Sequence, residues 1–189
     1  IGRIVSSTLE IDEVFPEFSE QVQELLQFDR MVVASLSEDR TKLVDRFVQG
    51  VELEGVAATL DALKQSEFYE QVFENKLQYR TTISRKPDYP ALETRRLQAL
   101  QADLRSILVT PLLWRGEVEG VLTFRSYDPE AFGDHQAGLA LQISQQIAGA
   151  IATSDQYAIV ERESEERQTL ADEQTGIAEI GRIVSSTLD

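Results

Sequence analysis

The chain has 189 residues, of which 42% are hydrophobic, and a net charge of −15 at pH 7. This length allows one domain with extensions or two small domains, and the apolar fraction is sufficient for a packed core. The sequence holds no run of about 18 apolar residues, so we expect no membrane-spanning segment and no direct membrane contact. The acidic charge argues against nucleic-acid binding through the field of the whole chain.

Cysteine is absent, and His135 is the single histidine. The absence of cysteine excludes disulfides, thiolate metal sites and cysteine nucleophiles. His135 falls in the first turn of an expected helix, and we interpret it as a solvated side chain rather than a ligand of a metal or haem. The sequence contains no glycine-rich phosphate loop, and no serine has a suitable base, so we expect no enzyme activity from this chain.

The first part of the chain predicts a helix followed by two strands. Apolar residues keep helical spacing over residues 11–27, and short apolar runs over 31–36 and 42–48 favour strands. In the second strand we expect Leu43 and Phe47 to lie on one side. Before the first strand stands the pair Asp29-Arg30, which we interpret as a structural ion pair or a feature of the strand start.

The middle of the chain is less regular. Residues 56–63 predict a short helix, and residues 67–77 predict a better one because apolar side chains recur there every four positions. A short strand is expected over 79–83. Helical spacing returns over 92–100, after a loop that two prolines bracket.

The clearest pattern is a hairpin followed by a helix. Residues 107–114 and 118–126 predict two strands, joined by a polar turn whose Gly116 can take a positive φ angle. In the second strand one side is expected to hold Val118, Gly120, Leu122 and Phe124. The helix is expected to begin at Gly133 or Asp134, with an apolar stripe formed by Leu139, Ile143, Ile147 and Ile151.

Two stretches of the chain are identical. Residues 1–9 read IGRIVSSTL, and residues 180–188 read the same, which is an interval of 179 residues (180 − 1). The simplest interpretation is a tandem array of one repeated unit, and the alternative is a cloning artefact.

The end of the chain favours a helical linker. No proline occurs from residue 134 to residue 187, so the helix is free to continue. A weak heptad seam follows, and we expect a homodimer to form through the terminal helices. The seam consists of Leu170, Ile177, Ile180 and Val184.

The hairpin and the helix resemble the C-terminal half of GAF domains. The resemblance rests on features in the family's order: Pro111 in a strand, Gly116 in a turn, Gly120-Val121-Leu122, Phe132, and the run Gln146-Ile147-Ala148-Gly149-Ala150-Ile151. It implies an α+β fold of GAF/PAS type, in which helices flank a central antiparallel β-sheet and a long C-terminal linker helix follows. We expect residues 1–10 to end an N-terminal linker helix, 11–152 to form the GAF-like domain, and 153–189 to form a helical linker that ends in the next repeat.

The resemblance also implies a place for a small molecule. In GAF domains the middle region closes a pocket over one sheet face, and an alternative is that its aromatic side chains fill that space themselves. Asn75-Lys76 resembles the start of the cyclic-nucleotide motif of the family, but the rest of that motif does not follow, so no cyclic nucleotide is assigned. The pocket candidates are Tyr69, Phe73, Tyr79, Arg80 and Trp114.

The resemblance carries expectations about cofactors and function. Without cysteine the chain cannot hold a covalent bilin or act as a methionine sulfoxide reductase of GAF type, and it offers no suitable histidine for haem. We therefore expect no cofactor. The resemblance implies a cytoplasmic sensory domain of a bacterial sensor kinase or nucleotide cyclase, which passes changes induced by an unidentified ligand or a partner through its terminal helices. The alternative is a ligand-free spacer and dimerisation module in a tandem array.

Overall fold

The computed structural model describes residues 11–53, 59–64, 66–83, 99, 102–151 and 167–168, and of residues 11–14 it describes the backbone alone. The chain forms two units, Ile1–Ala152 and Thr153–Asp189. In the second unit residues 167 and 168 are described, and both are helical. Apart from residues 167 and 168, the expected linker helices lie outside the described residues, as do the seam from Leu170 to Val184 and all but one residue of the expected helix over 92–100.

A five-stranded antiparallel sheet forms the centre of the first unit. Its strand order is β2-β1-β5-β4-β3, so the first and last strands of the sequence pair at the centre of the sheet. This sheet confirms the expected fold class. The strands are β1 (Arg30–Leu36), β2 (Leu43–Gly50), β3 (Tyr79–Thr82), β4 (Ser106–Trp114) and β5 (Glu117–Ser126).

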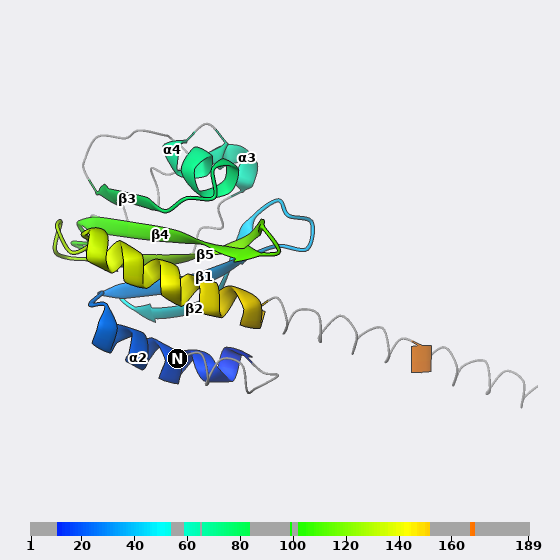
Figure 1. Cartoon of the computed structure of the whole chain (residues 1–189), viewed down its shortest axis with the longest axis horizontal. Helices are drawn as coiled ribbons and strands as arrows, with labels where there is room; N and C mark the ends of the chain where they lie inside the picture. Colours follow the sequence, from blue (N-terminus) through cyan, green and yellow to red (C-terminus); the bar gives the residue numbers. More distant parts are fainter. Residues whose placement is uncertain are drawn as a thin grey trace, which may run out of the picture. The chain divides into compact units, whose positions relative to one another are not determined.

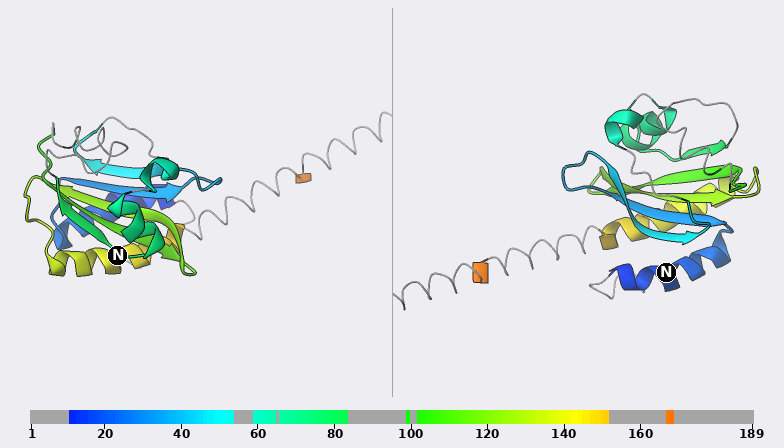
Figure 2. Two further views of the ribbon diagram at one scale, coloured as in Figure 1. Left: turned by 90° about the horizontal axis from the view of Figure 1, so that it is seen from above. Right: turned by 180° about the vertical axis from the view of Figure 1, so that it is seen from behind.

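Helices cover both faces of the sheet. Helix α2 (Ile11–Leu25) and the helix over residues 134–151 share one face, and Figure 1 shows the yellow helix along β4 and β5 with the blue α2 beside β2. The other face is covered by α3 (Leu60–Leu63), α4 (Glu67–Tyr69) and the π-helix η1 (Glu70–Glu74). Figure 2 shows α3 and α2 on opposite sides of the strands.

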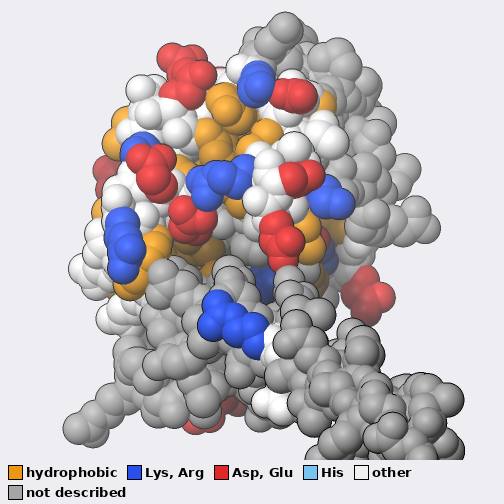
Figure 3. Space-filling model, turned by 90° about the vertical axis from the view of Figure 1, so that its right-hand side faces the viewer, with side chains coloured by type: hydrophobic (Ala, Val, Ile, Leu, Met, Phe, Trp, Pro, Cys, Tyr) orange, Lys and Arg blue, Asp and Glu red, His pale blue; other side chains and the backbone are white. Residues whose placement is uncertain are grey.

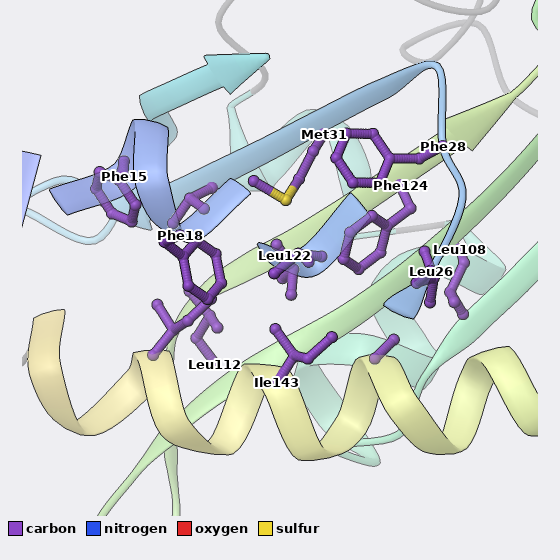
Figure 4. Close-up of a cluster of buried hydrophobic side chains, with 14 of the residues drawn as sticks. Phe15, Phe18, Leu26, Phe28, Met31, Leu108, Leu112, Leu122, Phe124 and Ile143 are labelled. Carbon is purple, nitrogen blue, oxygen red and sulfur yellow. The ribbon is translucent and has the colours of Figure 1, made fainter. Parts of the chain in front are cut away.

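The larger core lies between the sheet and the two long helices. Phe18 of α2, Phe124 of β5 and Ile147 of helix 134–151 are fully buried there. Figure 4 shows these elements meeting around Met31 and Leu122. Burial of each large apolar side chain contributes about 1.5–3 kcal/mol to stability, so this layer fixes the position of helix 134–151 on the sheet.

A smaller core lies on the opposite face. Val32, Val109 and Val121 are buried there beneath Val72 of η1. Because both faces are covered, the central strands bury side chains in both directions, and the neighbours Val121 and Leu122 are both buried.

The expected side of Phe47 was wrong because β2 contains a bulge. Val33 pairs with Phe47 and Ala34 pairs with Asp45, so Arg46 is an extra residue in the ladder. One extra residue reverses the faces of all that follow it. Leu43 therefore packs in the smaller core and Phe47 against the larger one.

A second register shift corrects the expected alternation of β5. Leu112 pairs with Gly120, but Leu113 pairs with Val118, so Glu119 is the extra residue. Gly120 keeps its expected place on the side of helix 134–151 with Leu112, whereas Val118 joins the side of Leu113. The alternation is as expected from Gly120 to the end of the strand.

The turn between β4 and β5 has two residues, both with positive φ. Arg115 has a φ of 51° and Gly116 a φ of 84°, and the flanking Trp114 pairs with Glu117. This geometry matches the right-handed twist of paired strands. The two central residues leave little freedom, so β4 and β5 move as one hairpin.

Pro111 is accommodated because β3 is short. Ile83 N donates to Arg105 O, and by alternation the nitrogen of Pro111 points towards β3 as well. The pairing of β3 with β4 ends at Tyr79 and Val109, before Pro111 is reached. No ladder hydrogen bond is lost there, which explains how a proline stands inside β4.

Asp29 acts at the start of β1, in agreement with one of the two expected roles. Its Oδ2 accepts hydrogen bonds from Ser126 Oγ and Tyr127 N, each at 2.8 Å. Its backbone O accepts from Val51 N at 2.9 Å. The carboxylate thereby joins the start of β1 to the end of β5, and the backbone joins it to the end of β2.

Candidate functional site

An aromatic cluster lies under the short helices. Phe68 meets Phe73 and Tyr79 edge-on, with ring centroids 6.0 and 5.7 Å apart. Tyr69 stacks on Phe73 at 5.1 Å. We call these four residues the aromatic cluster. All four are half-buried, and Phe68, Phe73 and Tyr79 pack against the smaller core.

The local sequence explains how the cluster forms. Ser66 Oγ accepts a hydrogen bond from Tyr69 N at 3.1 Å and so caps the first turn. The turn then widens, since Asn75 N donates to Glu70 O five residues earlier. In such a π-helix, residues five apart lie on one side, which brings Phe73 next to Phe68. Phe68 is not among the pocket candidates, because the expected helix places side chains four apart, and not five apart, on one side.

The structure separates the five pocket candidates into two groups. Tyr69, Phe73 and Tyr79 lie together in the aromatic cluster. Arg80 follows Tyr79 in β3 and therefore faces the other side, where its Nη2 lies 3.0 Å from Asp134 Oδ1. Trp114 also lies on that side, so the five residues do not surround one space.

Trp114 packs against helix 134–151. A Cβ placed on Gly149 would stand 3.4 Å from Trp114 Cζ3, which is van der Waals contact. The Arg115 guanidinium lies 5.7 Å from the indole centre. The indole Nε1 is buried and has no hydrogen-bond partner among the described residues. Packing therefore holds this ring in place.

Two polar residues that are not among the pocket candidates, Gln78 and Lys76, connect the segment after η1 to the hairpin and to helix 134–151. Gln78 Nε2 donates to Thr110 Oγ1 at 2.9 Å and to Ala137 O at 2.8 Å, so it links the start of β3 to β4 and to helix 134–151. Lys76 Nζ donates to Gly116 O and lies 3.3 Å from Glu117 Oε1. Both residues look like surface polar residues in sequence, and their contacts depend on tertiary structure.

An open cavity of about 570 Å³ lies elsewhere, at the end of the sheet where β4 starts and β5 ends. Arg105 forms an ion pair with Asp103 beside it. None of the five candidates is among the described residues that line this cavity, which are Ala102, Asp103, Arg105 and Tyr127.

The two groups whose pKa values are clearly shifted, Asp39 and Lys64, lie in exposed turns. Hydrogen bonds from the hydroxyls of Ser37 and Thr41 and from the Thr41 backbone lower the pKa of Asp39 from 3.8 to about 2. A hydrogen bond to Asp61 raises the pKa of Lys64. Both hydrogen-bonded groups stabilise local turn structure, and Lys64 also interacts electrostatically with Tyr69 of the aromatic cluster.

The described residues contain no grouping of three histidine, cysteine, aspartate or glutamate side chains suited to a metal ion. His135 is exposed in the first turn of helix 134–151, as expected. On the face shown in Figure 3, basic and acidic side chains are interspersed. None of the helices in the described part of the chain combines the length and apolar character needed to cross a bilayer.

Solved structures share the fold at low sequence identity. The GAF domain of a two-component sensor histidine kinase from Bacillus halodurans aligns with a TM-score of 0.65 and 18% identity, over 80% of this chain and 99% of that chain. Residues 122 to 287 of a methyl-accepting chemotaxis protein align with a TM-score of 0.63 and 18% identity, over 82% and 97%.

A third similar structure is an enzyme. Free methionine-R-sulfoxide reductase from Neisseria meningitidis, in complex with its substrate, aligns with a TM-score of 0.62 and 16% identity, over 82% of this chain and 86% of that chain. Comparison with curated proteins gives no match. The family model described as "GAF domain" matches residues 10–151. That match covers most of the chain and agrees with the sheet order and covering helices, so the chain belongs to the GAF domain family.

Proposed function

We propose that this GAF domain is a sensory and regulatory unit of a multidomain bacterial signalling protein, located in the cytoplasm and without catalytic activity of its own. Support comes from relatives of the same fold in a sensor histidine kinase and a chemotaxis protein. The observation that carries the proposal is that the two faces of the sheet hold different features. One face holds the aromatic cluster under short helices, and the other holds helix 134–151, after which the chain continues.

The proposed mechanism needs differential affinity. An effector that binds one arrangement of the aromatic cluster better than another shifts the population between them. The effector is a small molecule or a neighbouring domain, and no bilin, haem or other cofactor takes part. The change reaches an output domain through the terminal helices, and the output is a histidine kinase or a nucleotide cyclase.

The proposal includes a homodimer through the terminal helices. Its support is the seam of Leu170, Ile177, Ile180 and Val184 and the repeat of residues 1–9 at 180–188, which favours a tandem array. Light scattering should give twice the mass of the chain. A monomer at high protein concentration would contradict dimerisation of this part of the protein.

Effector binding is tested by a thermal-shift screen of small molecules. At 100 times its Kd a ligand stabilises the folded state by about 2.7 kcal/mol, which should raise Tm by about 5–10 °C for a domain of this size. Phe73→Ala in the aromatic cluster should abolish the shift. Phe15→Ala in the other core is the matched control and should keep it, although both variants start from a lower Tm.

A second function is favoured by the aromatic cluster itself. Phe68, Phe73 and Tyr79 pack against one another and against the smaller core, as expected for side chains that fill a former pocket. The domain would then be a ligand-free spacer and dimerisation module. In that case no compound raises Tm, while scattering still gives a dimer.

A further inference from the structure

The tip of the β4–β5 hairpin touches both layers that cover the sheet. We propose that this tip couples the aromatic cluster to helix 134–151, with Lys76 on one side and Trp114 on the other. The inference goes beyond the proposed sensory function because it names the residues that carry a change. The coupling exists without an effector and is measured without one.

Lys76 connects the tip to the aromatic cluster. It follows η1 and precedes Tyr79, so it lies between two residues of the cluster in sequence. Its φ of 57° and the hydrogen bond from Leu77 N to Gln71 O place it in a wide turn whose shape depends on the winding of η1. Its Nζ donates to Gly116 O at the tip. A change in the packing of Phe73 therefore displaces a side chain that holds the tip.

Trp114 connects the tip to helix 134–151. It directly precedes the two turn residues and pairs with Glu117, which also contacts Lys76. Its ring lies in van der Waals contact with the Gly149 position, two residues before the described helix ends. With no described hydrogen-bond partner for Nε1, the ring follows the hairpin backbone and moves against the helix when the tip moves.

The turn between these contacts transmits displacement because it is short. Two residues, both in the left-handed region, join β4 to β5. A longer loop would absorb the movement of Lys76, whereas a two-residue turn passes it to Trp114. The path therefore runs through two contacts and one rigid hairpin.

Lys76→Gln tests the coupling in the full chain by hydrogen exchange. We expect the amides of residues 146–151 to exchange about threefold faster, which is the size of effect that an exposed charged contact allows. The amides of α2 should not change, because general destabilisation would affect both long helices of the larger core. Emission from Trp114, the only tryptophan, should shift as well.

Lys64→Gln is the matched control. It removes another exposed lysine contact, the pair with Asp61 in α3, which does not reach the hairpin. In this variant, the amide exchange rates of residues 146–151 and the Trp114 emission should equal those of the original chain. Equal exchange at 146–151 in the Lys76 and Lys64 variants would overturn the proposal. Faster exchange in α2 and helix 134–151 alike would also overturn it.

The role of Trp114 is tested by combining variants. In a Trp114→Phe background, Lys76→Gln should no longer change exchange at 146–151, and a persisting threefold effect would show that the path avoids Trp114. Gly149→Ala offers a second test that keeps the tryptophan. It adds a methyl group in contact with the ring, so the effect of Lys76→Gln should become larger, and an effect that does not grow contradicts the proposal. Both tests measure hydrogen exchange without an effector. A thermal-shift screen that finds no ligand would therefore argue against the proposed function without affecting either test of the coupling.

Discussion

Gly116 and Gly138 show how the same substitution has opposite effects in different backbone conformations. Neither glycine has an atom within 4 Å of the place where a Cβ would stand. Gly116 has a φ of 84°, a region that costs an L-residue about 1–2 kcal/mol. Gly138 lies inside helix 134–151, where alanine is favoured by about 1 kcal/mol. At both positions the backbone conformation, rather than the room for a Cβ, therefore decides whether alanine stabilises or destabilises the protein.

Urea denaturation should reveal this contrast. Gly116→Ala is expected to lower the free energy of unfolding by about 1–2 kcal/mol, and Gly138→Ala to raise it by about 1 kcal/mol. The two variants add the same methyl group, so each controls for the other. A loss of stability in both would mean that their surroundings, rather than φ, determine the effect.

Asp39 gives a pH prediction at the residue scale. Its folded pKa of about 2 lies below the ordinary 3.8, so its stabilising contribution is complete above pH 3.8 and is lost as the pH falls from 3.8 to about 2. Carboxyl NMR titration should give the low pKa directly. Ser37→Ala should raise the pKa towards 3.8, and by more than Thr41→Val, because the Ser37 hydrogen bond is the largest cause. An unchanged pKa in the Ser37 variant would contradict this assignment.

At the element scale, periodicity predicted most elements but not their irregularities. The expected strand over 31–36 is observed as Arg30–Leu36, because an apolar run between polar turns has few alternatives. The bulges at Arg46 and Glu119 could not be predicted, since each depends on the pairing partner. The expected helix over 67–77 becomes α4 and a π-turn, which changes the spacing of side chains that meet.

Phe68 tests the importance of that π-turn. It contacts both Phe73 and Tyr79, so Phe68→Ala should lower the free energy of unfolding by about 2–3 kcal/mol, less than for a fully buried phenylalanine. Tyr127→Ala is the control, because this aromatic side chain is 48% exposed, and it should change stability by less than about 0.5 kcal/mol. Denaturant midpoints measure both. A Phe68 variant as stable as the control would show that the aromatic cluster contributes little.

At the scale of the whole molecule, the sequence could not predict on which face of the sheet each pocket candidate lies. Tyr69, Phe73 and Tyr79 share one layer because the π-turn and the alternation of β3 bring their side chains together on one face of the sheet. Arg80 and Trp114 belong to the opposite layer. The side of Arg80 follows from its place after Tyr79 in β3, whereas the side of Trp114 is known only once the register of β3 with β4 is known. The candidates rest on position in the chain and residue type, and neither shows on which face of the sheet a side chain lies.

The pairing of β1 with β5 joins the two halves of the chain, and Gly120 lies in it. A Cβ there would stand 2.2 Å from Ala34 O, a backbone atom that cannot move without separating the strands. Gly120→Ala should therefore lower the free energy of unfolding by about 3 kcal/mol or more. Gly133→Ala is the control, since its Cβ would meet the flexible Gln136 side chain at 3.2 Å. Similar midpoints for the two variants would show that the sheet adapts.

The bulge in β2 also bears on how copies of this protein meet. β2 is an outer strand, and strands at a sheet border offer unpaired backbone groups to any neighbour. The extra residue interrupts that row beside two exposed charged side chains, those of Asp45 and Arg46. β3, at the far border, has only four residues. Among the described strands, neither border is therefore a good template for adding a strand from another molecule.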